Sequence, residues 1–138
     1  MTTAIKTNIR AAVITPHEVV LIPDSVFDKG GSMADFIHSV VDGYFDCVRP
    51  NDMARGFVGY VHDEGLLLGL EPNAMASAVF GKFLVGNCVI VGAISDTGEY
   101  DGDNHNLSSD DLNYLMWLAG AQKMWLDNYE IHHEKEEE

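Results

Sequence analysis

Apolar runs and turn-forming residues alternate most clearly between Gly56 and Ile94, and this stretch dominates the predicted fold. The runs are short and are separated by glycine, proline, asparagine and acidic residues, which is typical of strands joined by tight connections. We expect a strand at 57–62, then an Asp-Glu-Gly turn, and a returning hairpin strand at 66–70. The nearly continuous apolar run at 84–94 predicts the central strand of the sheet.

Two shorter segments carry helix signals. Ser32 is a favourable N-cap, and apolar residues recur after it at intervals of three and four until Gly43. Asn73 can cap a helix of small residues over 74–80, which Gly81 ends. Small side chains would let this second helix lie close to a sheet.

The flanking segments complete the predicted architecture. Runs at 9–14 and 19–22 predict a hairpin, and 44–48 predicts a further strand. A last helix begins after the N-cap Ser108 and extends to about Tyr129. We therefore expect an α+β fold, with a mainly antiparallel sheet of about five or six strands and two or three helices packed on one face.

Composition places the chain among soluble globular proteins. Its 138 residues are 46% hydrophobic and 22% charged, which predicts one domain over 1–130 and a disordered acidic tail at 131–138. No apolar run approaches the roughly 20 residues that cross a bilayer. The first ten residues lack the apolar core of a signal peptide. We therefore expect a cytoplasmic protein with no membrane partner.

The formal net charge is −14, and it is uneven along the chain. Residues 83–138 contain twelve acids and two bases, which gives −10 for that part alone. Such a surface repels nucleic-acid phosphates and attracts basic protein surfaces. We therefore expect no direct binding to nucleic acid, although solubility alone also explains an acidic surface.

The segment 96–106 is acidic and contains glycine, and it is predicted to be a loop. Asp101 and Asp103 match the start of a calcium-binding loop, and Glu99 adds a third carboxylate. The match then fails, because the sixth position is Asn106 and the twelfth is not glutamate. The pattern favours a solvated loop over a weak cation site, and no metal-binding residues are predicted.

Motifs for catalysis and cofactor binding are missing from the sequence. Cys47 and Cys88 lie in apolar runs, which predicts buried free thiols. No Gly-x-Ser-x-Gly elbow is present, and the glycines before Ser32 lack the lysine of a phosphate-binding loop. We therefore predict no catalytic residues and no cofactor.

The last predicted helix is apolar around much of its circumference. A leucine stripe can dock on the sheet, and a second stripe then needs another layer, a second copy or a partner protein. Packing within the domain and an interface with a partner both remain open. Methionine and tryptophan are favoured at adaptable interfaces. The candidate partner-binding residues are Met116, Trp117, Met124 and Trp125, together with the acids Glu99, Asp101 and Asp103.

A family resemblance rests on a series of short motifs. These are Val-His-Asp-Glu-Gly at 61–65, Gly-Leu-Glu-Pro-Asn at 69–73, Gly-Asn-Cys-Val-Ile-Val-Gly at 86–92 and Asp-Thr-Gly-Glu at 96–99. With them the chain resembles, over roughly 10–112, an uncharacterised family of small bacteriophage and plasmid proteins, a domain of unknown function. The resemblance implies a phage gene product acting inside a bacterium, and it supplies no catalytic residues. The longer last helix departs from the short form of that family.

Three functional hypotheses follow. The leading one is a small acidic phage accessory protein, non-enzymatic, that binds a host or phage protein in the bacterial cytoplasm; one form of it is a DNA mimic. The second is a small-molecule binder or enzyme with a pocket between loops 65–73 and 96–105. The third is an architectural protein that self-associates into an oligomer. The polar groups of the hypothetical pocket are His62, Asp63, Glu99, Asp101 and His105.

Overall fold

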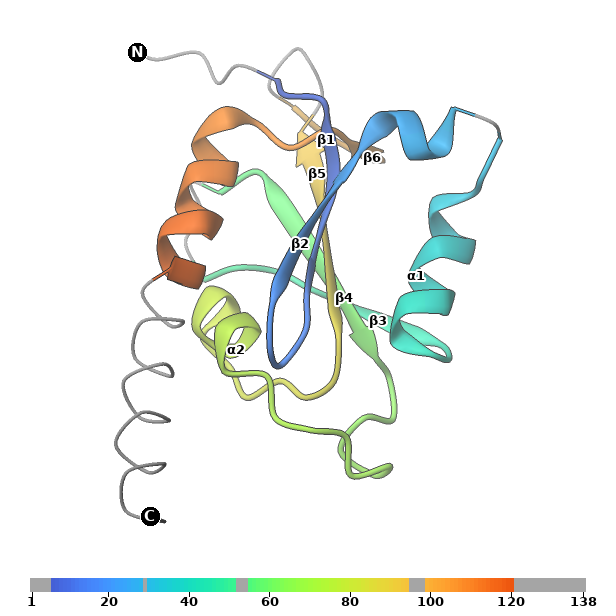
Figure 1. Cartoon of the computed structure of the whole chain (residues 1–138), viewed down its shortest axis with the longest axis vertical. Helices are drawn as coiled ribbons and strands as arrows, with labels where there is room; N and C mark the ends of the chain where they lie inside the picture. The colour runs from blue at the N-terminus through green and yellow to red at the C-terminus, as the bar shows by residue number, and fades with distance from the viewer. Residues whose placement is uncertain (1–5, 29, 52–54, 95–98, 121–138) are drawn as a thin grey trace, which may run out of the picture.

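Strand β5 (Cys88–Ile94) lies at the centre of a six-stranded sheet (Figure 1). The computed structural model describes residues 6–28, 30–51, 55–94 and 99–120. The strand pairings within these ranges are all antiparallel, and the sheet order is β2-β1-β5-β4-β3, with β6 paired to β5 beside this path. The other strands are β1 (Ile9–Ile14), β2 (Val19–Pro23), β3 (Phe45–Val48), β4 (Phe57–His62) and β6 (Tyr100–His105).

The sequence of β5 explains its central place. Cys88 and Ile90 point into one hydrophobic core, whereas Val89, Val91 and Ala93 point into another. Because successive side chains of a strand face opposite sides, a run that is apolar at every position needs cover on both faces. The predicted central strand is confirmed, although it begins at residue 88 and not at 84.

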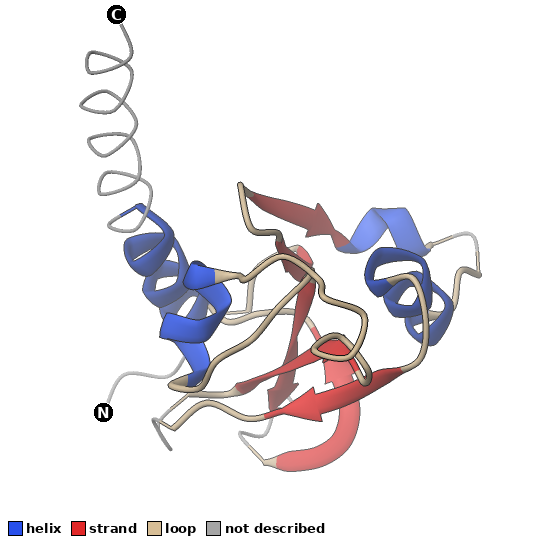
Figure 2. Ribbon diagram, turned by 90° about the horizontal axis from the view of Figure 1, so that it is seen from below, coloured by secondary structure: helices blue, strands red, loops and turns tan. Residues whose placement is uncertain are grey.

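Helices cover both faces of the sheet. Helix α1 (Met33–Val41) packs on one face through Ile37 and Val41. Helix α2 (Ala74–Phe80) and the helical residues 109–120, here called the C-terminal helix, pack on the other. Figure 2 shows the two helical layers on either side of the strands. The α+β fold is therefore as predicted, but the placement of the helices on one face is wrong.

Helix starts follow the predicted caps. Ser32 Oγ accepts a hydrogen bond from the Asp35 N–H at 3.2 Å. Helix α1 ends at Asp42, which adopts a left-handed conformation with φ +62°, one residue before the predicted Gly43. A short 3-10 helix, η1 (Asp24–Phe27), follows β2.

Asn73 does more than cap α2. Its side chain is fully buried, and its Oδ1 accepts a hydrogen bond from the Ala76 N–H at 3.0 Å. Its Nδ2 donates to the carbonyls of Ile14 and Gly86, each at 2.8 Å. One amide therefore joins α2, the end of β1 and the segment that leads into β5.

Two predicted elements are wrong. The segment 66–70 is a turn, closed by hydrogen bonds from the Leu68 N–H to the Glu64 carbonyl and from the Leu70 N–H to the Gly65 carbonyl. It cannot pair with β4, because β3 and β5 already occupy both edges of that strand. The acidic segment predicted as a loop contains β6, which pairs with the end of β5.

Candidate functional site

The C-terminal helix is fixed to the sheet at its first turn. Ser108 Oγ accepts a hydrogen bond from the Asp111 N–H at 3.2 Å, which confirms the predicted cap. The buried Asp111 carboxylate accepts a hydrogen bond from the Gly56 N–H at 3.0 Å and lies 3.4 Å from Arg55 Nη1. The Arg55 guanidinium in turn stacks over the Tyr114 ring, 4.7 Å from its centroid.

Burial of Asp111 has an electrostatic consequence. Desolvation raises the pKa of its carboxyl above the usual 3.8. The hydrogen bond from Gly56 and the positive charge of Arg55 act against this rise. The carboxyl group is thus a structural anchor for the helix, held by a backbone donor and a cation.

Beyond this anchor the helix has an inner and an outer face. Leu115 and Ala119 are buried in the core shared with α2. On the outer face the Trp117 side chain is 69% exposed and Met116 is 43% exposed. Since the inner face already supplies the packing with the sheet, the two outer side chains are available for another contact.

The structure describes only some of the other predicted partner-binding residues. Glu99, directly before β6, and Asp103, within β6, are both exposed. Asp101 belongs to the same strand, but its side chain lies outside the described set. Met124 and Trp125 also lie outside the described residues, as does the tail at 131–138.

The described residues of the hypothetical small-molecule pocket lie in two separate places. His62 Nδ1 lies 3.5 Å from Asp63 Oδ1 at the end of β4. His62 ends β4 beside Phe45, and its Nδ1 accepts a hydrogen bond from the Glu64 N–H at 2.9 Å. His105 pairs with Gly92, toward the opposite end of β5. No cluster of three or more metal-ligating side chains is found among the described residues.

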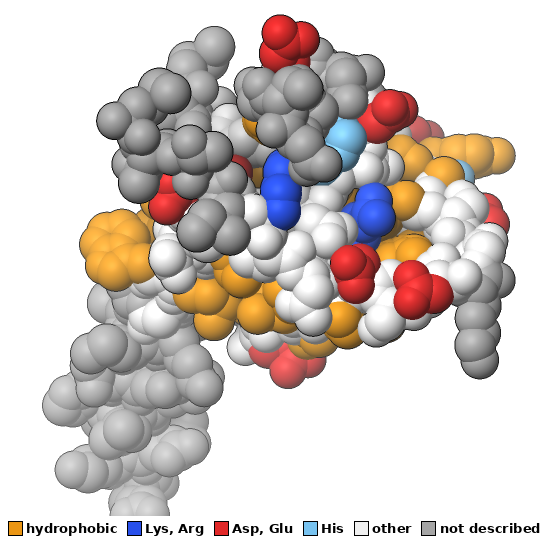
Figure 3. Space-filling view, turned by 90° about the horizontal axis from the view of Figure 1, so that it is seen from above, with side chains coloured by type: hydrophobic (Ala, Val, Ile, Leu, Met, Phe, Trp, Pro, Cys, Tyr) orange, Lys and Arg blue, Asp and Glu red, His pale blue; other side chains and the backbone are white. Residues whose placement is uncertain are grey.

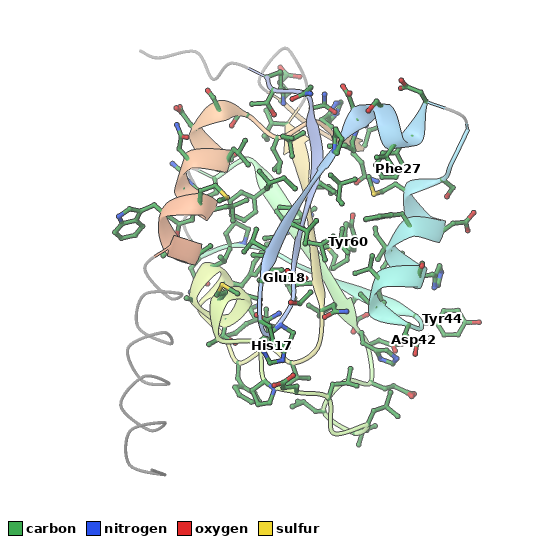
Figure 4. All side chains as sticks on the ribbon, viewed as in Figure 1. His17, Glu18, Phe27, Asp42, Tyr44 and Tyr60 are labelled. Carbon is green, nitrogen blue, oxygen red and sulfur yellow. The ribbon has the colours of Figure 1, made fainter. Side chains whose placement is uncertain are left out.

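An apolar loop at 66–68 was not identified as a surface feature from the sequence. Its three leucines are exposed, Leu67 by 87%. Gly69, with φ +68°, closes the turn at a position that favours glycine. The signal was present, because three leucines directly follow an Asp-Glu-Gly turn, but it was interpreted as a strand. Outside this loop and the C-terminal helix, the exposed large apolar side chains among the described residues are Val20, Val26, Phe83 and Tyr44. Tyr44 points away from the sheet in Figure 4.

The two cysteines have different environments. Cys88 is buried, as predicted, and burial raises the pKa of its thiol to about 12. Cys47 is exposed on β3, so the prediction that both thiols are buried is wrong. Partial desolvation raises the pKa of the Cys47 thiol, and the neighbouring Arg49 opposes that rise.

Comparisons with known proteins give one match. No curated protein and no solved structure matches the chain. Within the described ranges, no helix is long and apolar enough to cross a membrane. A family model described as a domain of unknown function matches residues 9–114, which include the sheet and the first turn of the C-terminal helix. The chain therefore belongs to this family, the domain of unknown function DUF3846.

Proposed function

We propose that the protein is a non-enzymatic binding protein that docks a partner protein on the outer face of its C-terminal helix. The observation that carries this proposal is the exposure of Trp117 on a helix whose opposite face is already packed. Tryptophan is the residue type most enriched at binding hot spots. Met116 beside it can adapt its shape to the partner.

The partner proposed is a protein with a basic surface around an apolar pocket. Asp110 lies on the outer side of the same helix, and Glu99 and Asp103 are exposed on the segment before it. With a net charge of −14, the chain attracts a basic surface and repels an acidic one. Following the resemblance, we propose a phage accessory role, with a host or phage protein as the partner in the bacterial cytoplasm.

The test compares two single substitutions in the full chain. Trp117→Ala removes the outer-face anchor, and Leu67→Ala removes an exposed apolar side chain elsewhere. Proteins retained from bacterial lysate are identified, and the affinity of the purified partner is then measured for each variant. Loss of Trp117 is expected to cost about 2 kcal/mol or more, roughly 30-fold in Kd, and loss of Leu67 much less.

Added salt and a measurement of the protein's molecular mass in solution provide the controls. Asp110→Asn and added salt are expected to slow association with the partner, because screening weakens long-range attraction. Equal retention by wild type and Trp117→Ala would contradict the proposal. A concentration-dependent dimer that Trp117→Ala dissociates would instead make a second copy of the chain the occupant.

A further inference from the structure

A cavity of about 180 Å³ lies where β1 and the end of β6 meet, at the upper end of the molecule in Figure 1. Its lining residues are Lys6, Arg10, His105 and Asn106. Figure 3 looks onto this end and shows basic and histidine side chains on it, with acidic side chains beside them. The volume is about tenfold greater than the roughly 10–15 Å³ that one water needs, so a small molecule can enter.

The two cations of the cavity are held by backbone carbonyls. Lys6 Nζ donates to the carbonyls of Ile94 and Asn106, which leaves one of its three N–H groups. Arg10 Nη1 donates to the Asn104 carbonyl at 3.0 Å. Arg10 Nε is buried and has no hydrogen-bond partner among the described residues. Among the described residues, no ion pair joins Lys6 or Arg10 to a carboxylate.

The amide of Asn106 adds an acceptor to these donors. Its Nδ2 donates to the Thr7 carbonyl and to Asp24 Oδ2, both at 2.9 Å. Both partners are acceptors, so the amide atom that faces them must be the nitrogen. The remaining amide atom is therefore the oxygen, Oδ1. Oδ1 is buried and, within the described part of the chain, accepts no hydrogen bond. Orphaned buried polar atoms of this kind are rare in proteins and indicate a missing partner.

We propose that this cavity binds a small oxyanion that carries a hydroxyl group, and that hydrogen phosphate is its simplest ligand. The anion's oxygens accept from Lys6 and Arg10, and its hydroxyl donates to Asn106 Oδ1. Arginine presents a planar fork of donors that fits an oxyanion. Because surrounding atoms cover Arg10 Nε and Asn106 Oδ1, binding requires the lining side chains to move so that the ligand reaches them.

Two features lie next to the cavity. Asp24 Oδ2, which accepts the hydrogen bond from Asn106 Nδ2, adds a negative charge to this network, so it disfavours highly charged anions. Arg10 also borders a second cavity of about 230 Å³ with Phe27, Gly31 and Met33. The Phe27 ring, labelled in Figure 4, contacts the Phe36 ring edge-on at 5.3 Å.

The inference is independent of the proposed protein-binding function, because it concerns neither Trp117 nor its helix face.

The experiment is calorimetric titration of the full chain with inorganic phosphate, sulfate and lactate, in separate runs at one ionic strength. Sulfate has the shape of phosphate but no hydroxyl at neutral pH, so it leaves Asn106 Oδ1 without a partner. We expect one phosphate per chain and at least about tenfold weaker binding of sulfate. Lactate carries both a carboxylate and a hydroxyl, so tighter binding of lactate than of phosphate would make a hydroxy acid the source of the ligand.

Substitutions test the assigned residues. Arg10→Gln is expected to weaken phosphate binding by about tenfold or more, whereas Lys82→Gln removes the same charge from an exposed site and leaves binding within about twofold. Circular dichroism checks that each variant folds, and Lys6→Gln provides a second test if Arg10→Gln does not fold. Absence of saturable binding by phosphate and lactate would overturn the proposal. Equal affinity for phosphate and sulfate, or equal losses in Arg10→Gln and Lys82→Gln, would overturn it too.

Discussion

Asp111 accepts a hydrogen bond from the Gly56 N–H at 3.0 Å, although 55 positions separate the two residues. The bond joins the first turn of the C-terminal helix to the residue before β4. A side chain at position 56 would disturb it, because a Cβ there would lie 2.6 Å from Ile94 Cγ1 and 3.2 Å from Asp111 Oδ2. The helix that presents Trp117 therefore depends on a glycine in another part of the chain.

The protonation of Asp111 makes stability depend on pH. Its pKa is raised in the folded protein, so the folded state binds the proton more tightly than the unfolded state does. The contribution of this group is greatest below pH 3.8 and is lost as pH rises through the folded pKa. Asp111→Asn keeps an acceptor for the Gly56 N–H and does not titrate.

Urea unfolding of wild type and Asp111→Asn, measured from pH 3.8 to neutral, isolates this effect. The stability of wild type relative to the variant is expected to fall as pH rises. A constant difference across that range would show that the folded-state pKa of Asp111 is not raised.

Asn73 is expected to be costly to replace. Asn73→Ala removes the N-cap of α2 and leaves the carbonyls of Ile14 and Gly86 without their donor, at a cost of about 2–4 kcal/mol. Asn87→Ala is the matched control, since among the described residues the Asn87 side chain donates one hydrogen bond, to the Val40 carbonyl at 3.0 Å. The Asn87→Ala substitution is expected to cost about 1 kcal/mol of stability. Chemical denaturation measures both, and equal losses would contradict this role for Asn73.

Gly59 is required by the packing of α2 on the sheet. A Cβ at this position would lie 2.4 Å from Phe80 Cζ and 3.1 Å from Val48 Cγ2. Phe80 is fully buried and cannot move aside, so Gly59→Ala is expected to destabilise the fold by about 1–3 kcal/mol. Gly31→Ala, which meets no atom within 4 Å, serves as the control. Thermal unfolding that ranks the two variants equally would argue against this contact.

Thiol labelling should separate the two cysteines. In the native protein, an aromatic disulfide reagent is expected to modify Cys47 and to leave Cys88 intact, because Cys88 is buried and its thiol has a pKa of about 12. In urea both thiols should react. Two rapidly reacting thiols in the native state would show that β5 opens readily. Cys47→Ser gives the baseline for Cys88 alone.

Local patterns predicted the helix starts and the β1–β2 hairpin correctly, but they gave β4 the wrong hairpin partner. Ser32, Asn73 and Ser108 cap their helices as expected, because a cap depends on three or four neighbouring residues. The leucines at 66–68 suited a strand, but the sheet had no free edge beside β4. The continuous apolar run of β5 indicates that both faces of the sheet are buried. Only the three-dimensional structure shows which helix packs on which face.

The two candidate sites also differ in how far the sequence predicts them. The apolar outer stripe of the last helix follows from helical spacing, so Met116 and Trp117 could be identified in advance. Lys6, Arg10 and Asn106 meet only because β1 and the segment after β6 lie side by side, with about a hundred positions between them. A cluster drawn from distant segments leaves no short motif, and the sequence contained no sign of it.

Strand β5 also sets the order in which the chain can fold during synthesis. The N-terminal half can form two separate hairpins, β1 with β2 and β3 with β4, as soon as those residues leave the ribosome. The facing edges of β1 and β4 stay unpaired until residues 88–94 emerge and are inserted between them. A growing chain therefore exposes both open strand edges while residues 63–87 are added, and a chain truncated after residue 87 should retain two hairpins without a sheet.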